Sequence, residues 1–296
     1  MTIFSLAAQG PHCATPTPSA SHGMETAPSR EKGAFFPEGR RFAAPSWVIP
    51  GTLAENCAFL AGRVDEAALL FFDAKASLEY TEKDIPSRLA LLPLSYHVHL
   101  PAVLPWHAPS RAAAICAALL GKINHLKDST PGGKNLPSHC RGVLHPPPHD
   151  PADAGKASRS LAAFSRSFRE AGGDPSLLFL ENVGANNLTD LTGVISGEGF
   201  GVCLDTGHML AYGQEHLSGN AFLLERTGLL HLNAPGRSVP AGAHLPLTAL
   251  DATGRRCCET VVRAAPPEAV LVAELFKWED IERSLPLIRS WLLPRA

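Results

Sequence analysis

The chain has 296 residues, of which 45% are hydrophobic and 18% are charged, and its formal net charge is −2. This balance is that of an ordinary globular protein, and it gives no basic excess for binding nucleic acid or an anionic membrane. No apolar run approaches the roughly 20 residues that a membrane-spanning helix needs. Seven cysteines without CxxC spacing predict free thiols rather than a disulfide framework. We therefore expect a cytoplasmic protein with no nucleic-acid or membrane partner.

The chain divides by composition into a short segment and a long one. Residues 1–44 are rich in Pro, Ser, Ala and Gly and follow neither a helical nor a strand period. They are predicted to form a flexible, disordered N-terminal tail. From about residue 46 onward, short runs of Val, Ile, Leu and Phe alternate with longer helix-like stretches, which is typical of βα units around a parallel sheet. Residues 45–296 are predicted to form one catalytic domain.

Eight βα pairs can be placed along this domain. The predicted strands are residues 46–50, 67–73, 94–100, 141–145, 176–182, 201–205, 229–233 and 269–275. The helices predicted to follow them are residues 52–62, 80–92, 110–126, 158–171, 188–196, 217–226, 255–264 and 278–292. Thr52 and Glu55 have the spacing of a capping box, which marks the start of the first helix. Eight such pairs without a linker between them predict a (β/α)8 TIM barrel.

Polar residues gather where the predicted strands end. In a TIM barrel the active site lies at the carboxyl ends of the strands. Taken alone, a strand-end aspartate is most often a cap or turn residue, and a lone histidine is most often a hydrogen-bonded core residue. A carboxylate that ends a strongly apolar strand is costly to bury without a partner. Six histidine and carboxylate residues on six consecutive strands together favour a shared site. They are His99, His145, Glu181, Asp205, His231 and Glu274, and His208 and His244 follow in loops on the same rim.

This set of side chains is suited to divalent metals. Imidazole nitrogens and carboxylate oxygens together bind Zn²⁺, Mn²⁺ or Fe²⁺, and several carboxylates in one site allow one of them to bridge two ions. Two ions about 3.5–4 Å apart can stabilise the attacking and leaving oxygens of a phosphoryl displacement. No nucleophile elbow, P-loop or dinucleotide-binding glycine motif competes with this interpretation. The sequence predicts metal-assisted chemistry with two divalent ions.

Four short motifs resemble a known superfamily. "FLENVG", "CLDTGH", "LHLN" and "VAEL", in this order on successive strands, resemble the xylose isomerase-like superfamily, which includes endonuclease IV and many sugar isomerases and epimerases. The resemblance implies that Glu181, Asp205, His231 and Glu274 form a four-ligand metal site. In endonuclease IV-like hydrolases, the positions of His99 and His145 complete a second site in which Glu181 is the bridging ligand.

The resemblance also separates His208 and His244 from the other candidates. In the hydrolases, the residues at the positions that match His208 and His244 bind a third metal. An aspartate two residues before the second position completes that site, and this chain has Gly242 there. A complete third site is therefore not expected. His208 and His244 remain candidate catalytic residues beside Glu181 and Asp205, either as ligands or as contacts to phosphate.

The N-terminal part of the barrel resembles one branch of the superfamily more closely. "SWVIPGTLAENCAFLAGRVDEAALLFFDA" and "YHVHLP" are similar to the cobamide-remodelling phosphodiesterase (CbiR) family. This resemblance implies hydrolysis of the nucleotide-loop phosphodiester of a cobamide to cobinamide phosphate and α-ribazole, with a corrinoid as the small-molecule partner. Trp47, Trp106 and Phe276 are candidates for contacts with this partner, although packing is an alternative role for each.

Three other functions remain open from the sequence. A metal-dependent sugar isomerase or epimerase would need only the four shared ligands, and it would leave His145 and His244 without a role. A non-catalytic corrinoid-binding protein would not need six strand-end ligands. Cleavage of damaged DNA is disfavoured by the net charge, because gripping several phosphates draws on a basic surface.

Overall fold

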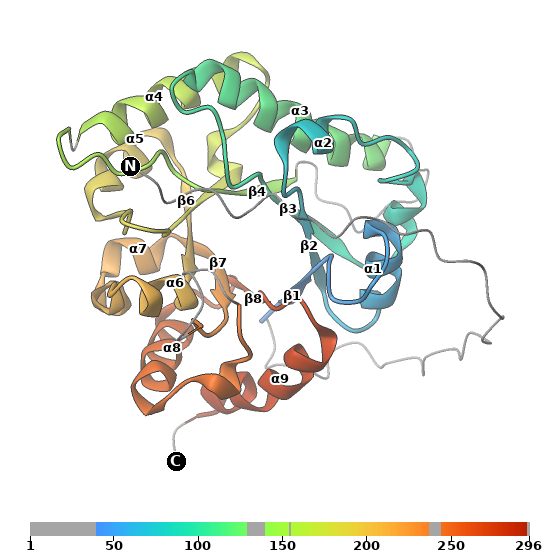
Figure 1. Cartoon of the computed structure of the whole chain (residues 1–296), viewed down its shortest axis with the longest axis vertical. Helices are drawn as coiled ribbons and strands as arrows, with labels where there is room; N and C mark the ends of the chain where they lie inside the picture. Colours follow the sequence, from blue (N-terminus) through green and yellow to red (C-terminus); the bar gives the residue numbers. More distant parts are fainter. Residues whose placement is uncertain (1–39, 129–139, 154, 237–243, 295–296) are drawn as a thin grey trace. The chain divides into compact units, whose positions relative to one another are not determined.

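The computed structural model describes residues 40–128, 140–153, 155–236 and 244–294. Eight parallel strands close into a barrel in which each strand pairs with the next and β8 pairs with β1 (Figure 1). The strands are β1 Phe42–Pro45, β2 Glu66–Leu70, β3 Ser95–His99, β4 Arg141–Leu144, β5 Leu178–Glu181, β6 Gly201–Asp205, β7 Thr227–Leu232 and β8 Val270–Ala273. The predicted TIM barrel is confirmed.

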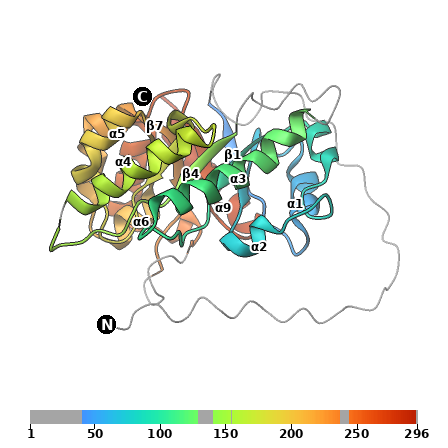
Figure 2. The ribbon, with the colours of Figure 1, turned by 90° about the horizontal axis from the view of Figure 1, so that it is seen from above.

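Helices surround the barrel on its outer side. They are α1 Leu53–Leu60, α2 Ala74–Leu78, α3 Pro109–Asp128, α4 Gly155–Glu170, α5 Thr192–Glu198, α6 Thr206–Ala211, α7 Ala221–Glu225, α8 Ala252–Ala264 and α9 Trp278–Leu292. Helices α3 and α4 lie side by side in both views (Figures 1 and 2). Among the described helices, none combines the length and the apolar character needed to cross a membrane.

The first strand lies earlier in the chain than predicted. It is Phe42–Pro45 rather than residues 46–50, and it pairs with β2 and β8. Its sequence, FAAP, has no Val or Ile and so gives little strand signal, whereas the more strand-like "SWVIP" forms a loop after it. Residues 42–44, which were assigned to the predicted tail, are thus part of the barrel. Residues 1–39 of the predicted tail lie outside the described residues.

Two predicted helices also differ from the structure. Residues 80–92 form no α-helix; instead the short α2 begins after the cap Asp73, and a 3₁₀ turn at Ser87–Leu91 follows Pro86. Proline has no backbone N–H to donate and its ring crowds the preceding turn, so Pro86 disfavours a continuous helix here. Residues 217–226 are likewise divided into a 3₁₀ turn, Glu215–Gly219, and α7. The predicted capping box at Thr52 and Glu55 is confirmed, as is the helix at residues 278–292.

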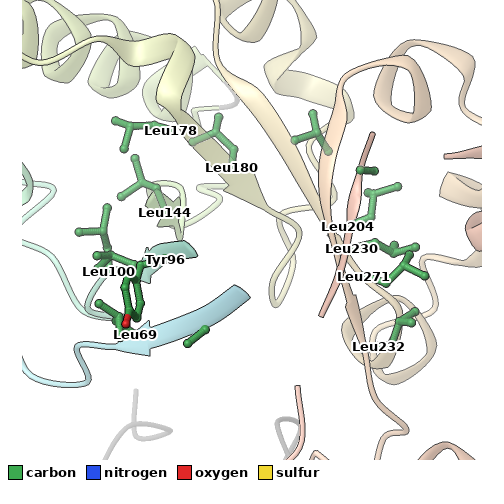
Figure 3. Packing of buried hydrophobic residues seen from close by; sticks show 14 of the residues in the cluster. Leu69, Tyr96, Leu100, Leu144, Leu178, Leu180, Leu204, Leu230, Leu232 and Leu271 are labelled. Atoms are coloured by element: carbon green, nitrogen blue, oxygen red, sulfur yellow. The ribbon is translucent and has the colours of Figure 1, made fainter. Parts of the chain in front are cut away.

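Alternate residues of each strand face the helices and the barrel interior, because side chains alternate along a strand. The helix-facing set includes Leu69, Leu144, Leu180, Leu204 and Leu230, which belong to the larger buried cluster (Figure 3). The inward-facing apolar residues form a separate small cluster. They are Ala43, Ala68, Val143, Cys203, Leu229, Val270 and Val272. This apolar layer lies beneath the strand ends and provides a rigid floor for the polar residues there.

A charged cluster closes the opposite, N-terminal end of the barrel. Glu66 at the start of β2 is buried and receives Arg141 on both carboxylate oxygens at 2.7 and 2.8 Å and Arg41 at 2.7 Å. His97 contacts the same carboxylate through Nδ1 at 2.5 Å. Burial raises the pKa of Glu66. The bond from His97 and the charges of Arg141 and Arg41 outweigh burial and lower the pKa to about 2. His97 is thus buried and bonded to a carboxylate at this end of the barrel, which gives it a structural role.

Replacing Glu66 with glutamine is expected to destabilise the fold. The change leaves Arg141 and Arg41 without their shared charged partner, at an expected cost of about 2–4 kcal/mol in the free energy of unfolding. Because the folded-state pKa is lowered, the stabilisation is present above the unfolded pKa of about 4.3 and disappears as pH falls toward 2. Urea denaturation of wild type, Glu66→Gln and the exposed control Glu79→Gln at pH 7 and pH 3 measures this. An equal difference at the two pH values would contradict it.

Candidate metal centre

The fold brings all six predicted strand-end residues to the same end of the barrel. His99, Glu181 and Asp205 are the last residues of β3, β5 and β6, and His231 lies within β7. His145 and Glu274 come directly after β4 and β8. Parallel strands in a closed barrel share one carboxyl end, so positions far apart in the sequence converge there. The grouping predicted from the sequence is present in the fold.

His208 and His244 lie at the same centre, as expected from the rim. His208 is in α6, which begins immediately after Asp205, so a single strand-to-helix junction supplies two side chains. His244 directly precedes Leu245, whose backbone exchanges hydrogen bonds of 2.9 and 2.8 Å with Ala234 after β7. This isolated bridge fixes the chain next to the centre. Gly242, the departure from the third-site pattern, lies outside the described residues.

The two carboxylate oxygens of Glu181 face two different sets of nitrogens. Its Oε2 lies 3.0 Å from His145 Nε2 and 3.3 Å from His99 Nε2. Its Oε1 lies 3.1 Å from His231 Nδ1 and 3.6 Å from His208 Nδ1. A carboxylate placed in this way can bind one ion through each oxygen. Glu181 therefore has the position of a bridging ligand.

Asp205 and Glu274 complete the side of the centre that faces Oε1 of Glu181. His231 Nδ1 lies 3.1 Å from Glu274 Oε2 and 3.8 Å from Asp205 Oδ2. His244 Nδ1 lies 3.2 Å from the same oxygen of Glu274. Possible ligand atoms of these residues lie within 4.8 Å of one another in overlapping groups. The predicted four-residue set and the predicted additional histidines are thus adjacent.

Hydrogen bonds outside the centre orient its histidines. His99 Nδ1 contacts the Leu100 carbonyl at 3.0 Å, and His208 Nδ1 contacts the Asn182 carbonyl at 2.9 Å. A carbonyl only accepts, so the Nδ1 atom carries a hydrogen in both residues, and in the neutral ring Nε2 has the lone pair. Bonds of this kind are usual behind metal-binding histidines, because they set the ring orientation and the tautomer. They leave His99 and His208 with one nitrogen each for an ion.

Three amide side chains that the sequence analysis did not single out support Asp205. Asn182 accepts from the Asp205 backbone N–H at 2.7 Å and donates to its carbonyl at 3.1 Å. Gln214 accepts from Asn182 at 3.1 Å, and Asn233 donates to Asp205 Oδ2 at 2.8 Å. The available signal was the asparagine directly after two strand ends, in "LEN" and "HLN". The cross-strand pairing that makes these residues neighbours of Asp205 comes only from the fold.

Gly207 is required for the Asn233 contact. A Cβ atom added at Gly207 would overlap the side-chain oxygen of Asn233, so alanine would displace the amide that holds Asp205 Oδ2. We expect Gly207→Ala to weaken metal affinity by about 10- to 100-fold, the usual effect of losing a hydrogen-bond partner of a ligand. Competition with a chromophoric chelator measures it. Gly197→Ala is the control, since its Cβ meets nothing within 4 Å, and equal affinities in the two folded variants would contradict the prediction.

Burial and charge act against each other on two of the carboxylates. Burial alone raises the pKa of Glu181 and Glu274, but His231 beside both holds their pKa well below the usual range. His145 contributes on Glu181, and His244 contributes on Glu274. Both groups are therefore anionic near neutral pH, which suits binding of a cation.

Asp205 has fewer compensating charges. Burial raises its pKa, His208 opposes this, and the charges of Glu274 and Glu181 raise it again. Burial lowers the pKa of His244, but Glu274 beside it raises the value to about 9. Protons on histidines thus balance the clustered carboxylates, and a bound cation would take over that role.

The chemistry of the residues fits divalent metal ions. Three buried atoms that face this cluster, Oε2 of Glu181, Oε2 of Glu274 and Nδ1 of His244, lack a hydrogen-bond partner. Buried polar atoms without a partner are costly, and ion binding satisfies them. The carboxylates are at most 4% exposed, whereas His99, His145 and His244 retain 14–16% side-chain exposure. A substrate can therefore approach from the histidine side.

The structure also places the remaining side chains that the sequence analysis considered. Trp106 packs against Phe164 with ring centroids 5.4 Å apart, which gives it a packing role. Phe276 lies 4.8 Å from the ring of His244, at the edge of the centre.

Comparisons with known proteins agree with the fold. By sequence, no protein-family model and no curated protein matches the chain. By structure, it is similar to the IolI protein, whose 1.8 Å crystal structure has a bound zinc atom. The two chains are 12% identical, the match covers 85% of this chain and 95% of that chain, and the TM-score is 0.55. It is also similar to SacUVDE, with 12% identity, coverage of 85% and 98%, and a TM-score of 0.54. Both similarities extend over most of each chain and show a shared fold, which agrees with the predicted (β/α)8 barrel.

Proposed function

We propose that this protein is a metal-dependent phosphodiesterase that hydrolyses the nucleotide-loop phosphodiester of cobamides to cobinamide phosphate and α-ribazole. The observation that carries the proposal is the position of Glu181, whose Oε2 lies 3.0 and 3.3 Å from Nε2 of His145 and His99 and whose Oε1 lies 3.1 Å from Nδ1 of His231. Two divalent ions held in this way would neutralise charge on a phosphodiester and lower the pKa of a coordinated water. His99 and His145 would hold one ion, and Asp205, His231 and Glu274 would hold the other.

The residues beside the ligands have roles in the same reaction. Asn182 holds the Asp205 backbone and Asn233 donates to the Asp205 carboxylate, so the charge of this carboxylate stays directed at the centre. His208 is buried and His244 is half-buried beside the carboxylates, where their rings, when protonated, can contact a phosphate oxygen. The inward-facing apolar layer beneath the centre keeps water out from below. The chain thus supplies anionic ligands, oriented by amides, and cationic donors on the open side.

The substrate class is supported by sequence resemblance and by charge. "YHVHLP" and the segment from Ser46 to Ala74 resemble the cobamide-remodelling phosphodiesterases, and the net charge of −2 disfavours a substrate with many phosphates. A sugar isomerase with the four shared ligands would give no role to His145, yet His145 makes the shortest contact to Glu181, 3.0 Å. Hydrolysis of one phosphodiester on a small molecule fits these observations best.

One product analysis tests the proposal. The metal-loaded protein is incubated separately with a coenzyme-form cobamide, a panel of ketoses and an abasic DNA duplex, and the products are identified by mass. Cobinamide phosphate together with α-ribazole is the expected result, and it should disappear when a chelator removes the metal. An unchanged cobamide accompanied by conversion of a ketose would overturn the proposal in favour of an isomerase.

A further inference from the structure

Three aromatic residues form a continuous arc on the rim of the barrel. Trp47, Phe72 and Phe276 follow β1, β2 and β8, which are neighbouring strands. The ring centroids of Trp47 and Phe72 are 6.1 Å apart, and those of Phe72 and Phe276 are 6.5 Å apart. These distances are within the range of favourable aromatic contacts. We call these three residues the aromatic arc.

The outer part of the aromatic arc is open to solvent. Phe72 is 58% exposed and Trp47 is 51% exposed, whereas Trp106, on the next part of the rim, is half-buried against Phe164. Two large apolar side chains kept in contact in water leave unfavourable surface exposed, and contiguous patches of this kind mark interaction sites. The arc therefore has the character of a binding surface and not of core packing.

The inner end of the arc reaches the candidate metal centre. Phe276 lies edge-on to the ring of His244, with centroids 4.8 Å apart, and His244 Nδ1 lies 3.2 Å from Glu274 Oε2. A molecule lying on the arc therefore has one end beside the metal ligands. This continuity identifies the occupant as a part of the substrate rather than as a separate partner.

We propose that the aromatic arc is a binding subsite for a large, flat, mainly apolar ring system that carries the phosphodiester into the metal centre. Together with His244, the arc forms a row of four rings in contact, and this row is longer than a single sugar ring. The exposed residues Asp73 and Lys277 directly follow Phe72 and Phe276, so polar groups border the apolar surface. The identification of the ring system as a corrin rests on the proposed function.

Cobinamide tests the subsite without any reaction, because it contains the corrin ring and lacks the phosphodiester. Its affinity for the metal-loaded protein is measured by equilibrium dialysis, using the visible absorbance of the corrin. We expect Phe72→Ala and Trp47→Ala each to reduce this affinity by about tenfold or more, because each removes an aromatic contact surface. Phe72→Tyr should restore binding. Leu91→Ala is the matched control, since Leu91 is 63% exposed and lies before β3, at the other end of the barrel.

The outcomes separate the subsite from the proposed reaction. Equal cobinamide affinity in wild type, Phe72→Ala and Trp47→Ala, or no binding by the wild type, would overturn the subsite, even if cobamides are hydrolysed. Loss of binding in both variants but not in Leu91→Ala would support the subsite, even if no cobamide is hydrolysed. If hydrolysis does occur, the same two variants should raise KM for the cobamide and leave kcat within a few-fold of the wild type.

Discussion

Replacing Glu181 with glutamine is expected to abolish hydrolysis, with a loss of about 10³-fold or more in kcat/KM. Glutamine keeps the size of the side chain but provides only one carbonyl oxygen, so the nitrogens that face Oε1 and Oε2 of Glu181 no longer share an anionic bridge. Metal content should fall below that of the wild type, which elemental analysis of the dialysed protein measures. Full activity with an unchanged metal content would refute the bridging role.

Glu66→Gln is the matched control for this prediction. Both glutamates are buried within the same barrel, but Glu66 is at the opposite end and is neutralised by Arg141 and Arg41. The Glu66 variant should lose stability and keep its metal, whereas the Glu181 variant should lose its metal and keep a folded barrel. His145→Ala adds a second comparison. It should abolish hydrolysis by removing one of the two histidines at Oε2, while an isomerase that uses only the four shared ligands would stay active.

The strand ends of this protein were predictable because each is an abrupt change in polarity. Glu181 and Asp205 directly follow the apolar residues of β5 and β6, and a buried carboxylate at the end of an apolar strand demands an explanation. The parallel topology then places such residues together without any information on side-chain contacts. The six-residue grouping at the candidate metal centre therefore followed from the sequence.

Other features depend on contacts that the sequence does not contain. β1 is defined by its pairing with β2 and β8, although its residues are weak strand formers. Asn182 and Asn233 resemble ordinary turn residues until the fold brings them to Asp205. Phe72 was assigned to the end of a predicted strand, but β2 ends at Leu70, and the contacts of Phe72 with Trp47 and Phe276 come only from the structure.

Metal affinity is expected to rise steeply with pH. A protonated imidazole cannot bind a metal, so each ligand histidine whose pKa lies above the working pH must release a proton when the ion binds. Burial lowers the pKa of His231, but the neighbouring Cys203, Glu274 and Glu181 raise it well above the usual value. The affinity for Zn²⁺ should therefore increase by about tenfold per pH unit for each proton released. Chelator competition at pH 6, 7 and 8 measures the slope, and an affinity independent of pH would contradict the prediction.

The same titration decides whether His244 is a ligand. Its pKa is raised to about 9, so as a ligand it still releases a proton at pH 8, and its contribution to the slope ends only above pH 9. His244→Ala should then reduce the affinity, and it should reduce the slope between pH 8 and 9 when the titration is extended to pH 9. If His244 instead contacts the substrate, the slope should remain that of the wild type while KM for the cobamide rises. The two results distinguish a metal-ligand role of His244 from a substrate-contact role. The sequence left this open because Gly242 replaces the aspartate of the third metal site.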